Sequence, residues 1–269
     1  MKKVVIIPTY NERENIAAMI AKVFSLAEPF DMLVVDDGSP DGTAAIVREH
    51  QAKFPERLFM LERSGKLGLG TAYMTGFRWA LERGYDYVFE MDCDFSHNPD
   101  DLVRLYRAAA GESGAENGTA SACEARREGR SPQPIVSGAI GGADMVVGSR
   151  YIEGVNVVNW PMERLLMSYF ASRYVRMATG MPVRDATAGF VGYSRKVLET
   201  MELDSIKMKG YGFQIEMKYT AWKLGFRIKE VSIIFTERRE GQSKMSGGIF
   251  REAFWGVMGL RFRKIRRKQ

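Results

Sequence analysis

Tyr87-Val-Phe-Glu-Met-Asp-Cys-Asp-Phe-Ser-His-Asn-Pro99 is the stretch that most restricts the fold. An apolar run over 85–91, typical of a buried strand, ends in Asp92 and Asp94, and Asn98-Pro99 stops the element. At the end of a strand, two carboxylates at this spacing can face one point in a cleft. Magnesium and manganese prefer oxygen ligands and often take one or two carboxylates plus substrate phosphates. The stretch therefore predicts a metal site for a nucleotide diphosphate, and the alternative is a pair of turn-forming aspartates.

The segments before this stretch alternate between short apolar runs and helical patterns. Strands are predicted over 3–8, 32–35 and 58–61, and helices over about 16–23, from 43 onward, and up to about 82. This alternation implies a parallel sheet with right-handed crossovers. In such sheets ligands bind outside the carboxyl ends of the strands, where the polar loops 9–12 and 36–42 are expected to lie.

The pattern is interrupted once, over 111–142. This segment has almost no large apolar residues before Ile135, so it cannot build much core, and we interpret it as a flexible surface insertion. A helix over about 100–110 precedes this insertion. After it, strands are predicted over 144–148, 190–193 and 228–235, the last as an edge or final strand, and helices over 162–179 and 210–224. The fold class is α/β, a mostly parallel sheet flanked by helices, with one domain over 1–247 and an amphipathic basic segment over 248–269.

The composition is ordinary for a folded protein, and the charge favours anionic partners. The 269 residues are 45% hydrophobic and 27% charged, enough for a sizeable core. A net charge of +6 and a pI near 9.2 favour nucleotide, phospholipid or nucleic acid. Cys93 and Cys123 give no disulfide framework or zinc spacing, and Cys93 is predicted to be buried, pointing away from the aspartates. Neither a signal peptide nor a spanning helix is expected.

The segment Arg63-Ser-Gly-Lys-Leu-Gly-Leu-Gly-Thr-Ala72 opens a predicted helix with a glycine-rich loop. It does not match the P-loop or dinucleotide spacing. A glycine-rich helix start that carries Lys66 can nevertheless attract phosphate. The alternative is that the glycines serve turn geometry only.

The segment 248–269 has the pattern of an amphipathic helix with aromatic side chains and a basic end. Its closing cations are Arg261, Arg263, Lys264, Arg266, Arg267 and Lys268. Such a helix can bind a membrane interface, with each cation contributing roughly 1 kcal/mol near anionic lipid. The alternative is a helix packed on the core with a solvated basic end. Nucleic acid is not an expected partner, because the chain has no recognisable RNA-binding module.

Taken together, these motifs resemble those of the polyprenyl-phosphate (dolichol-phosphate) mannose synthases, inverting family 2 glycosyltransferases with a GT-A (Rossmann-like) fold. The resemblance covers nearly the whole chain apart from the insertion. In the first half it rests on Ile6-Ile-Pro-Thr-Tyr-Asn-Glu-Arg-Glu-Asn15, Val34-Val-Asp-Asp-Gly-Ser-Pro-Asp-Gly-Thr43, Gly65-Lys-Leu-Gly-Leu-Gly70 and Met91-Asp-Cys-Asp-Phe-Ser-His97. In the second half it rests on Gly148-Ser-Arg-Tyr151, Thr187-Ala-Gly-Phe190, Gly212-Phe-Gln-Ile-Glu216 and Gly241-Gln-Ser-Lys244.

The resemblance implies a site for a sugar nucleotide and a metal. The residues that would hold the nucleotide are Pro8, Tyr10, Glu12, Asp37, Lys66 and Asp92. Asp92 and Asp94 would bind Mg²⁺ or Mn²⁺ on the diphosphate. Family members often carry Gln at the position of Ser96, where it can assist the metal, and some carry Ser, so Ser96 is a candidate third ligand.

The same resemblance implies an acceptor site and a catalytic set. The positions that grip the phosphate of a lipid acceptor correspond to Arg150, Arg164 and Ser168. Arg238 and Lys244 match cations near the donor diphosphate, and Gln214 and Glu216 would fall in the catalytic cleft. The implied catalytic residues are Asp94, Arg238, Lys244 and Gln214.

The implied chemistry needs no strong general base. A metal and nearby cations would stabilise the leaving diphosphate, and the attacking phosphate oxygen is already ionised at neutral pH. Positioning by arginines should then supply much of the rate. The chain has only two histidines, His50 and His97, and we interpret His97 as a structural or solvent-facing residue.

The predicted function is inverting transfer of mannose from GDP-mannose to a polyprenyl monophosphate. The nearest alternative is a transferase that moves glucose or another hexose from a UDP-sugar. A non-catalytic sugar-nucleotide-binding subunit is disfavoured by the intact metal and cation positions. The protein is expected to be cytoplasmic and peripheral at the cytoplasmic face of a membrane, reaching its lipid directly or through a membrane-protein partner.

Overall fold

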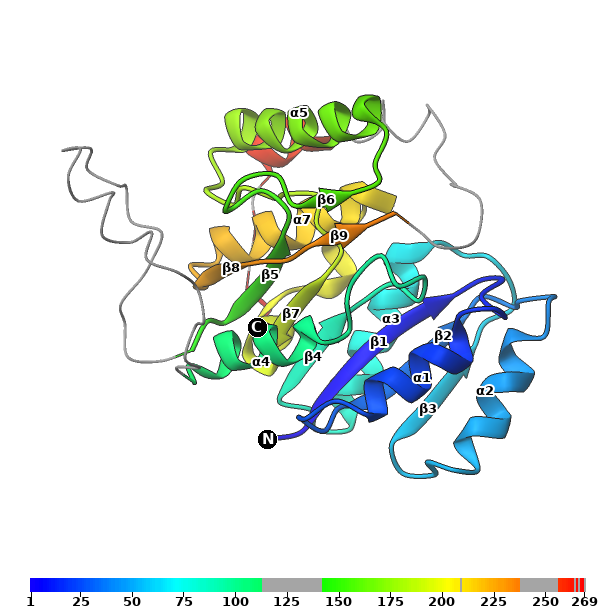
Figure 1. Cartoon of the computed structure of the whole chain (residues 1–269). Coiled ribbons are helices and arrows are strands. Elements are labelled where there is room, and N and C mark those ends of the chain that lie inside the picture. Colours follow the sequence, from blue (N-terminus) through cyan, green and yellow to red (C-terminus); the bar gives the residue numbers. More distant parts are fainter. Residues whose placement is uncertain (113–141, 209, 238–255, 264, 266, 269) are drawn as a thin grey trace.

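A seven-stranded sheet forms the centre of the computed structural model, which describes residues 1–112, 142–208, 210–237, 256–263, 265, 267 and 268 (Figure 1). Its strands, in the order β3-β2-β1-β4-β7-β5-β8, are β1 (Lys3–Thr9), β2 (Asp31–Asp36), β3 (Leu58–Glu62), β4 (Tyr87–Glu90), β5 (Met145–Ser149), β7 (Val191–Ser194) and β8 (Ile228–Ser232). Only β7 runs against its neighbours in this described sheet. The predicted mostly parallel sheet is confirmed.

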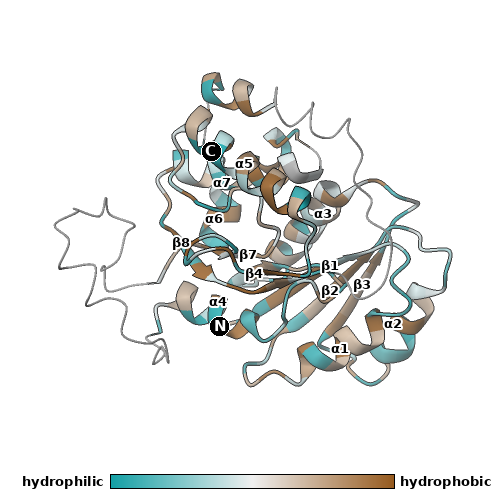
Figure 2. Ribbon diagram, turned by 45° about the horizontal axis from the view of Figure 1, so that its top comes forward, coloured by the Kyte–Doolittle hydropathy of each residue, from teal (hydrophilic) through white to brown (hydrophobic). Residues whose placement is uncertain are grey.

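The centre of the sheet is buried on both faces because β1, β2 and β5 are built from nearly continuous apolar runs, as parallel strands between helices require. In β1, Val5 and Ile7 point to one face, while Val4 and Ile6 point to the other. The first face is covered by α1 (Ile16–Phe24), α2 (Thr43–Gln51) and α4 (Asp101–Ala110), and the second by α3 (Leu69–Glu82), α6 (Arg195–Thr200) and α7 (Gly210–Lys223). Figure 2 shows the two helical layers on either side of the sheet.

One glycine in the sheet is required by packing. A Cβ at Gly192 in β7 would lie 2.4 Å from Phe89 and 2.8 Å from Val146, which belong to the two neighbouring strands. Neither side chain can move far, since both are fully buried. The close approach of β4, β7 and β5 therefore depends on this glycine.

A third apolar cluster joins α5 (Met162–Thr179), α7 and the helical residues 256–262. Val257 and Leu260 are buried in it against Val175 and Tyr219. Arg261 Nη1 also donates to the Ala178 carbonyl at 3.1 Å. The described part of the C-terminal segment thus packs on the domain, while residues 248–255 lie outside the described residues. No helix in the described part of the chain is long and apolar enough to cross a membrane.

The strand predicted over 228–235 is divided. The chain leaves the sheet after β8, where Ile233 is buried in the core and Ile234 is exposed to solvent. A second strand, β9 (Phe235–Thr236), then pairs with β6 (Val157–Val158) in a two-stranded ribbon. The short helix α6 and the 3-10 turn Leu203–Ser205 were also not predicted.

Candidate functional site

The site lies at the topological switch point of the sheet. The chain runs from β1 outward to β2 and β3, then returns to β4 on the other side of β1. The loops that follow β1 and β4 therefore part at their carboxyl ends and leave a crevice. A pocket of about 510 Å³ occupies it.

Apart from Glu216, the structure brings together all the predicted site residues that it describes. The pocket lining includes Pro8, Tyr10, Glu12, Asp37, Lys66, Asp92, Asp94, Ser96, Arg150, Arg164, Ser168 and Gln214. These residues come from seven separate segments of the chain. The remaining two predicted residues, Arg238 and Lys244, lie outside the described residues.

The two carboxylates sit in the loop that follows β4. Asp94 is 4% exposed, and its Oδ1 accepts hydrogen bonds from the Ser96 amide at 3.1 Å and from the Ser96 hydroxyl. Phe95, between Asp94 and Ser96, has a φ of 58°, a left-handed backbone conformation that reverses the chain direction. The Asp92 side chain is more open, at 34% exposed. Cys93 is buried in the core beside α1 and α4, as predicted.

The donor set at this loop fits a hard divalent cation that also binds a phosphate. No group of three His, Cys, Asp or Glu side chains suited to a metal occurs among the described residues. Two carboxylates can nevertheless hold magnesium or manganese when the substrate supplies further oxygen ligands. Because the Ser96 hydroxyl donates to Asp94, its clearest role here is to orient that carboxylate.

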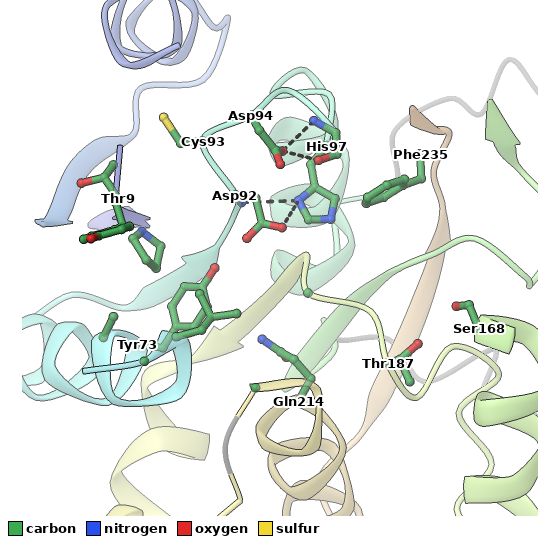
Figure 3. Close-up of a pocket in the computed structure, with 18 of the residues that line it drawn as sticks. Thr9, Tyr73, Asp92, Cys93, Asp94, His97, Ser168, Thr187, Gln214 and Phe235 are labelled. Carbon is green, nitrogen blue, oxygen red and sulfur yellow. Dashed lines mark hydrogen bonds and ion pairs between the residues drawn. The ribbon is translucent and has the colours of Figure 1, made fainter. Parts of the chain in front are cut away.

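His97 lies against the loop that carries the two carboxylates and forms a hydrogen bond with its backbone. It is 3% exposed and lies between the rings of Phe190 and Phe235, at centroid distances of 5.0 and 5.1 Å. Its Nδ1 accepts the Asp92 amide hydrogen at 3.4 Å, as Figure 3 shows. Burial lowers the pKa of His97 to about 4. The ring is therefore neutral at pH 7 and serves a structural role.

The side of the pocket that carries Asp37 and Lys66 is held by a residue that was not predicted. Arg63 Nε donates to Asp37 Oδ1 at 2.6 Å, and Arg63 Nη1 donates to Thr71 Oγ1 at 2.8 Å. The Leu67 amide donates to the second Asp37 oxygen at 3.2 Å. Asp37 is thereby tied to the glycine-rich loop that carries Lys66. Arg63 could have been noticed in the sequence as the cation that opens this loop.

Arg150 is fixed by a buried carboxylate. Its Nε and Nη2 each donate to Asp185 at 2.7 Å, and Nη2 also reaches Thr187 Oγ1 at 2.9 Å. The guanidinium lies over the rings of Trp160 and Phe235, at 5.4 and 5.5 Å. Burial alone would raise the pKa of Asp185, but the Arg150 ion pair holds that pKa below its usual value. The pair keeps the arginine in one orientation at the pocket wall.

Arg164 and Ser168 project into the pocket from one face of α5. Arg164 Nη1 pairs with Glu237 Oε1 at 2.6 Å and lies 4.4 Å from the Trp160 ring centroid. Ser168 Oγ accepts a hydrogen bond from the Tyr151 hydroxyl at 2.9 Å. An incoming phosphate would therefore compete with Glu237 for Arg164.

A cluster of buried polar side chains lies under the pocket. Of its members only Gln214 was predicted as a site residue. Gln214 Nε2 donates to Glu90 Oε2 at 2.7 Å, and Lys218 Nζ donates to Gln214 Oε1 at 3.4 Å and to the Ala188 carbonyl at 2.6 Å. Burial raises the pKa of Glu90 to about 8 and lowers the pKa of Lys218 to about 8. Tyr73 completes the floor, and burial raises its pKa well above the usual value. The i, i+4 spacing of Gln214 and Lys218 is the sequence signal for part of this cluster.

The prediction that Glu216 falls in the cleft is wrong. Glu216 is fully buried on another side of α7, two positions and about 200° around the helix from Gln214. Its Oε2 accepts the amides of Lys207 and Met208 at 2.9 and 2.7 Å, and Oε1 pairs with Arg263. Glu216 therefore holds the start of α7 and the C-terminal segment together.

Comparisons with known proteins agree with this geometry. The family model "Glycosyl transferase family 2" matches residues 4–123. A polyprenol monophosphomannose synthase from Mycolicibacterium smegmatis is 41% identical over 96% of this chain and 88% of its own length. An undecaprenyl-phosphate mannosyltransferase from Micrococcus luteus is 40% identical over 98% of this chain and 99% of its own.

The fold also has solved counterparts. A glucosyl-3-phosphoglycerate synthase from Mycobacterium tuberculosis, solved in complex with Mn²⁺, UDP and glucosyl-3-phosphoglycerate, has a TM-score of 0.63. The match covers 97% of this chain and 80% of that chain at 17% identity. At this identity the likeness extends to the GT-A fold, which was predicted.

Proposed function

Because the chain belongs to glycosyl transferase family 2, we propose that it transfers mannose from GDP-mannose to a polyprenyl monophosphate with inversion. The observation that carries the proposal is the single pocket that combines two groups of residues. One group, around Asp37, Asp92 and Asp94, suits a nucleoside diphosphate. The other, around Arg150 and Arg164, suits a phosphate monoester. The two mannosyltransferase relatives at about 40% identity support mannose as the sugar.

On the donor side, the residues orient a leaving diphosphate. Asp92 and Asp94 would hold Mg²⁺ or Mn²⁺, which when bound supplies positive charge for the diphosphate. The Ser96 hydrogen bonds fix Asp94, and neutral His97 fixes the backbone of Asp92. Asp37, held by Arg63, would contact the nucleoside. This preorganisation reduces the reorganisation needed as negative charge develops on the leaving group.

On the acceptor side, the residues orient a nucleophile that is already ionised. A phosphate monoester carries one to two negative charges at neutral pH, so its oxygen needs no base to remove a proton. That oxygen forms the new bond to the anomeric carbon, while the bond to the donor diphosphate breaks and its electrons leave with the diphosphate. Arg150, held by Asp185, and Arg164 would align the acceptor for this single displacement, which inverts the anomeric carbon.

A lipid acceptor also implies a membrane surface near the acceptor end, and α5 is suited to meet it. Met162, Leu166, Phe170 and Met177 fall on one face of α5 and are 66%, 47%, 59% and 68% exposed. The face of α5 that lines the pocket carries Arg164 and Ser168. Docking through α5 would therefore bring lipid headgroups close to the acceptor residues.

Donor binding tests this function. Calorimetry with Mg²⁺ present should give a lower Kd for GDP-mannose than for UDP-glucose, and chelation of the metal should weaken binding at least tenfold. Asp92→Ala should lose the metal dependence. Asp100→Ala is the matched control, because Asp100 lies nearby but is exposed and pairs with Lys22. Tighter binding of UDP-glucose than of GDP-mannose would contradict the mannosyl assignment.

A further inference from the structure

The centre of the pocket floor carries two polar groups, one from α3 and one from α7. Figure 3 shows Tyr73 and Gln214 between Thr9, on the nucleotide side, and Thr187 and Ser168, on the acceptor side. In a displacement between two phosphates, the anomeric carbon must lie between the leaving oxygen and the attacking oxygen. A hexose in transit would therefore lie over this part of the floor.

The Tyr73 hydroxyl has an unusual environment for a buried polar group. Tyr73 is fully buried but lines the pocket, and no described residue forms a hydrogen bond with its hydroxyl. Burying a hydroxyl without a partner disfavours folding, so such groups are uncommon unless a function requires them. In Figure 3 the hydroxyl is directed toward the side of the pocket that carries Asp92. A ligand group in the pocket would supply the hydrogen-bond partner that the described residues do not.

The Tyr73 ring cannot turn away from this position easily. It stacks on Phe213 with a centroid distance of 6.1 Å and on Phe77 at 6.3 Å. A Cβ at Gly70, one turn earlier in α3, would lie 3.0 Å from the same Phe213 ring, so the helix and the ring are tightly packed. The hydroxyl is thus held by a rigid aromatic stack, as a specificity-determining group should be.

The neighbouring amide is held in one orientation by two buried side chains, Glu90 and Lys218. Gln214 donates through Nε2 to Glu90 and accepts at Oε1 from Lys218. A flip of the amide would place its NH₂ group against the ammonium of Lys218, which loses the hydrogen bond that Lys218 donates to Oε1. Glu90 and Lys218 are therefore positioning residues for Gln214.

We propose that the Tyr73 hydroxyl donates a hydrogen bond to a hydroxyl oxygen of the transferred hexose, beside the Gln214 amide that Glu90 and Lys218 orient. This inference rests on the proposed function, since it requires a sugar nucleotide in the pocket. Tyr73 belongs to α3 and lies outside the loop of Asp92 and Asp94. It would contact the hexose rather than the nucleotide.

Tyr73→Phe tests the contact with little structural disturbance. The variant keeps the aromatic stack and removes only a hydroxyl that has no described protein partner, so its thermal unfolding midpoint should not fall. Tyr219→Phe is the matched control, because Tyr219 is also a buried tyrosine but packs against α5 and does not line the pocket. Each variant and the wild type are titrated calorimetrically with GDP-mannose and with GDP, with Mg²⁺ present.

For Tyr73→Phe we expect the Kd for GDP-mannose to rise about 3- to 30-fold and the Kd for GDP to change less than about twofold. Tyr219→Phe should match the wild type for both ligands. If Tyr73→Phe weakens GDP and GDP-mannose equally, the hydroxyl contacts the diphosphate, and the hexose assignment is wrong. Unchanged binding of both ligands would mean that it contacts neither. If wild-type protein binds no sugar nucleotide at all, the proposed function itself fails.

Discussion

His97 illustrates how a single buried residue supports the pocket. It carries no charge in the folded protein near neutral pH, and it links the Asp92 backbone to the rings of Phe190 and Phe235. The metal loop therefore rests on an apolar, aromatic support rather than on an ion pair. Because the folded protein disfavours the protonated ring, the free energy of unfolding should depend on pH in mild acid.

The predicted effect is a loss of stability in mild acid. The unfolded chain protonates His97 near pH 6.5, whereas the folded protein keeps it neutral down to about pH 4. Between these values the unfolded state binds the extra proton, so the free energy of unfolding should fall as pH drops. From pH 7 to pH 4.5 this residue should account for about 2 kcal/mol of the loss.

Urea unfolding at both pH values measures this effect. His97→Gln should show a smaller difference in the free energy of unfolding between pH 7 and pH 4.5 than the wild type. His50→Gln, which changes the other histidine on α2, should keep the wild-type difference. Equal pH dependence in all three proteins would rule out His97 as the source.

At the same scale, the sequence predicted the residues that carry charge into the pocket but not those that hold them. Asp92, Asp94 and Arg150 follow strands, so their place at the sheet edge could be predicted. Asp185 and Glu90 could not be assigned as supporting groups, because each meets its partner, Arg150 or Gln214, only through tertiary packing. Glu216 was misplaced because the helical phase of α7 relative to the pocket is set by packing.

Among the elements, α5 combines three roles on two faces. The first half of one face lines the pocket with Arg164 and Ser168, and the second half of the same face buries Ser172, Val175 and Thr179. The opposite face exposes apolar side chains. The sequence predicted the helix and left two alternatives for the segment 248–269, membrane binding and packing on the core. The described residues of that segment bury Val257 and Leu260 against α5 and α7, as the second alternative expects.

If α5 meets the membrane, its exposed apolar face should control lipid binding. We expect Leu166→Ser combined with Phe170→Ser to reduce sedimentation with anionic phospholipid vesicles roughly tenfold, because two apolar side chains no longer enter the interface. Ile234→Ser is the control, since Ile234 is equally exposed, at 61%, but follows β8. Equal loss in both proteins, or none in either, would exclude α5 as the docking element.

The order of strands in the sheet was harder to predict than the strands themselves. The β-branched runs identify β1, β2 and β5, and the alternation with helices predicts parallel pairing. The antiparallel insertion of β7 between β4 and β5 has no local signature, apart from Gly192, whose need is clear only when Phe89 and Val146 are in place. The division between β8 and β9 likewise depends on where Ile233 packs.

For the whole molecule, one pocket connects the proposed nucleotide residues to the proposed acceptor residues. Two of the latter, Arg164 and Ser168, lie on α5, the helix with the exposed apolar face. The net charge of +6 would favour approach to anionic lipid and to an anionic donor. The arrangement is that of an enzyme that joins a soluble donor to a lipid acceptor.

The most direct test is mannosyl transfer by the full chain. The protein is incubated with GDP-mannose, a short polyprenyl phosphate in detergent and Mg²⁺, and the lipid product is identified by mass spectrometry and its anomer by NMR. The account predicts a mannosyl-phosphoryl lipid with the anomeric configuration inverted from the donor, formed only when the metal is present. A hexosyl lipid formed from a UDP-sugar but not from GDP-mannose would contradict it.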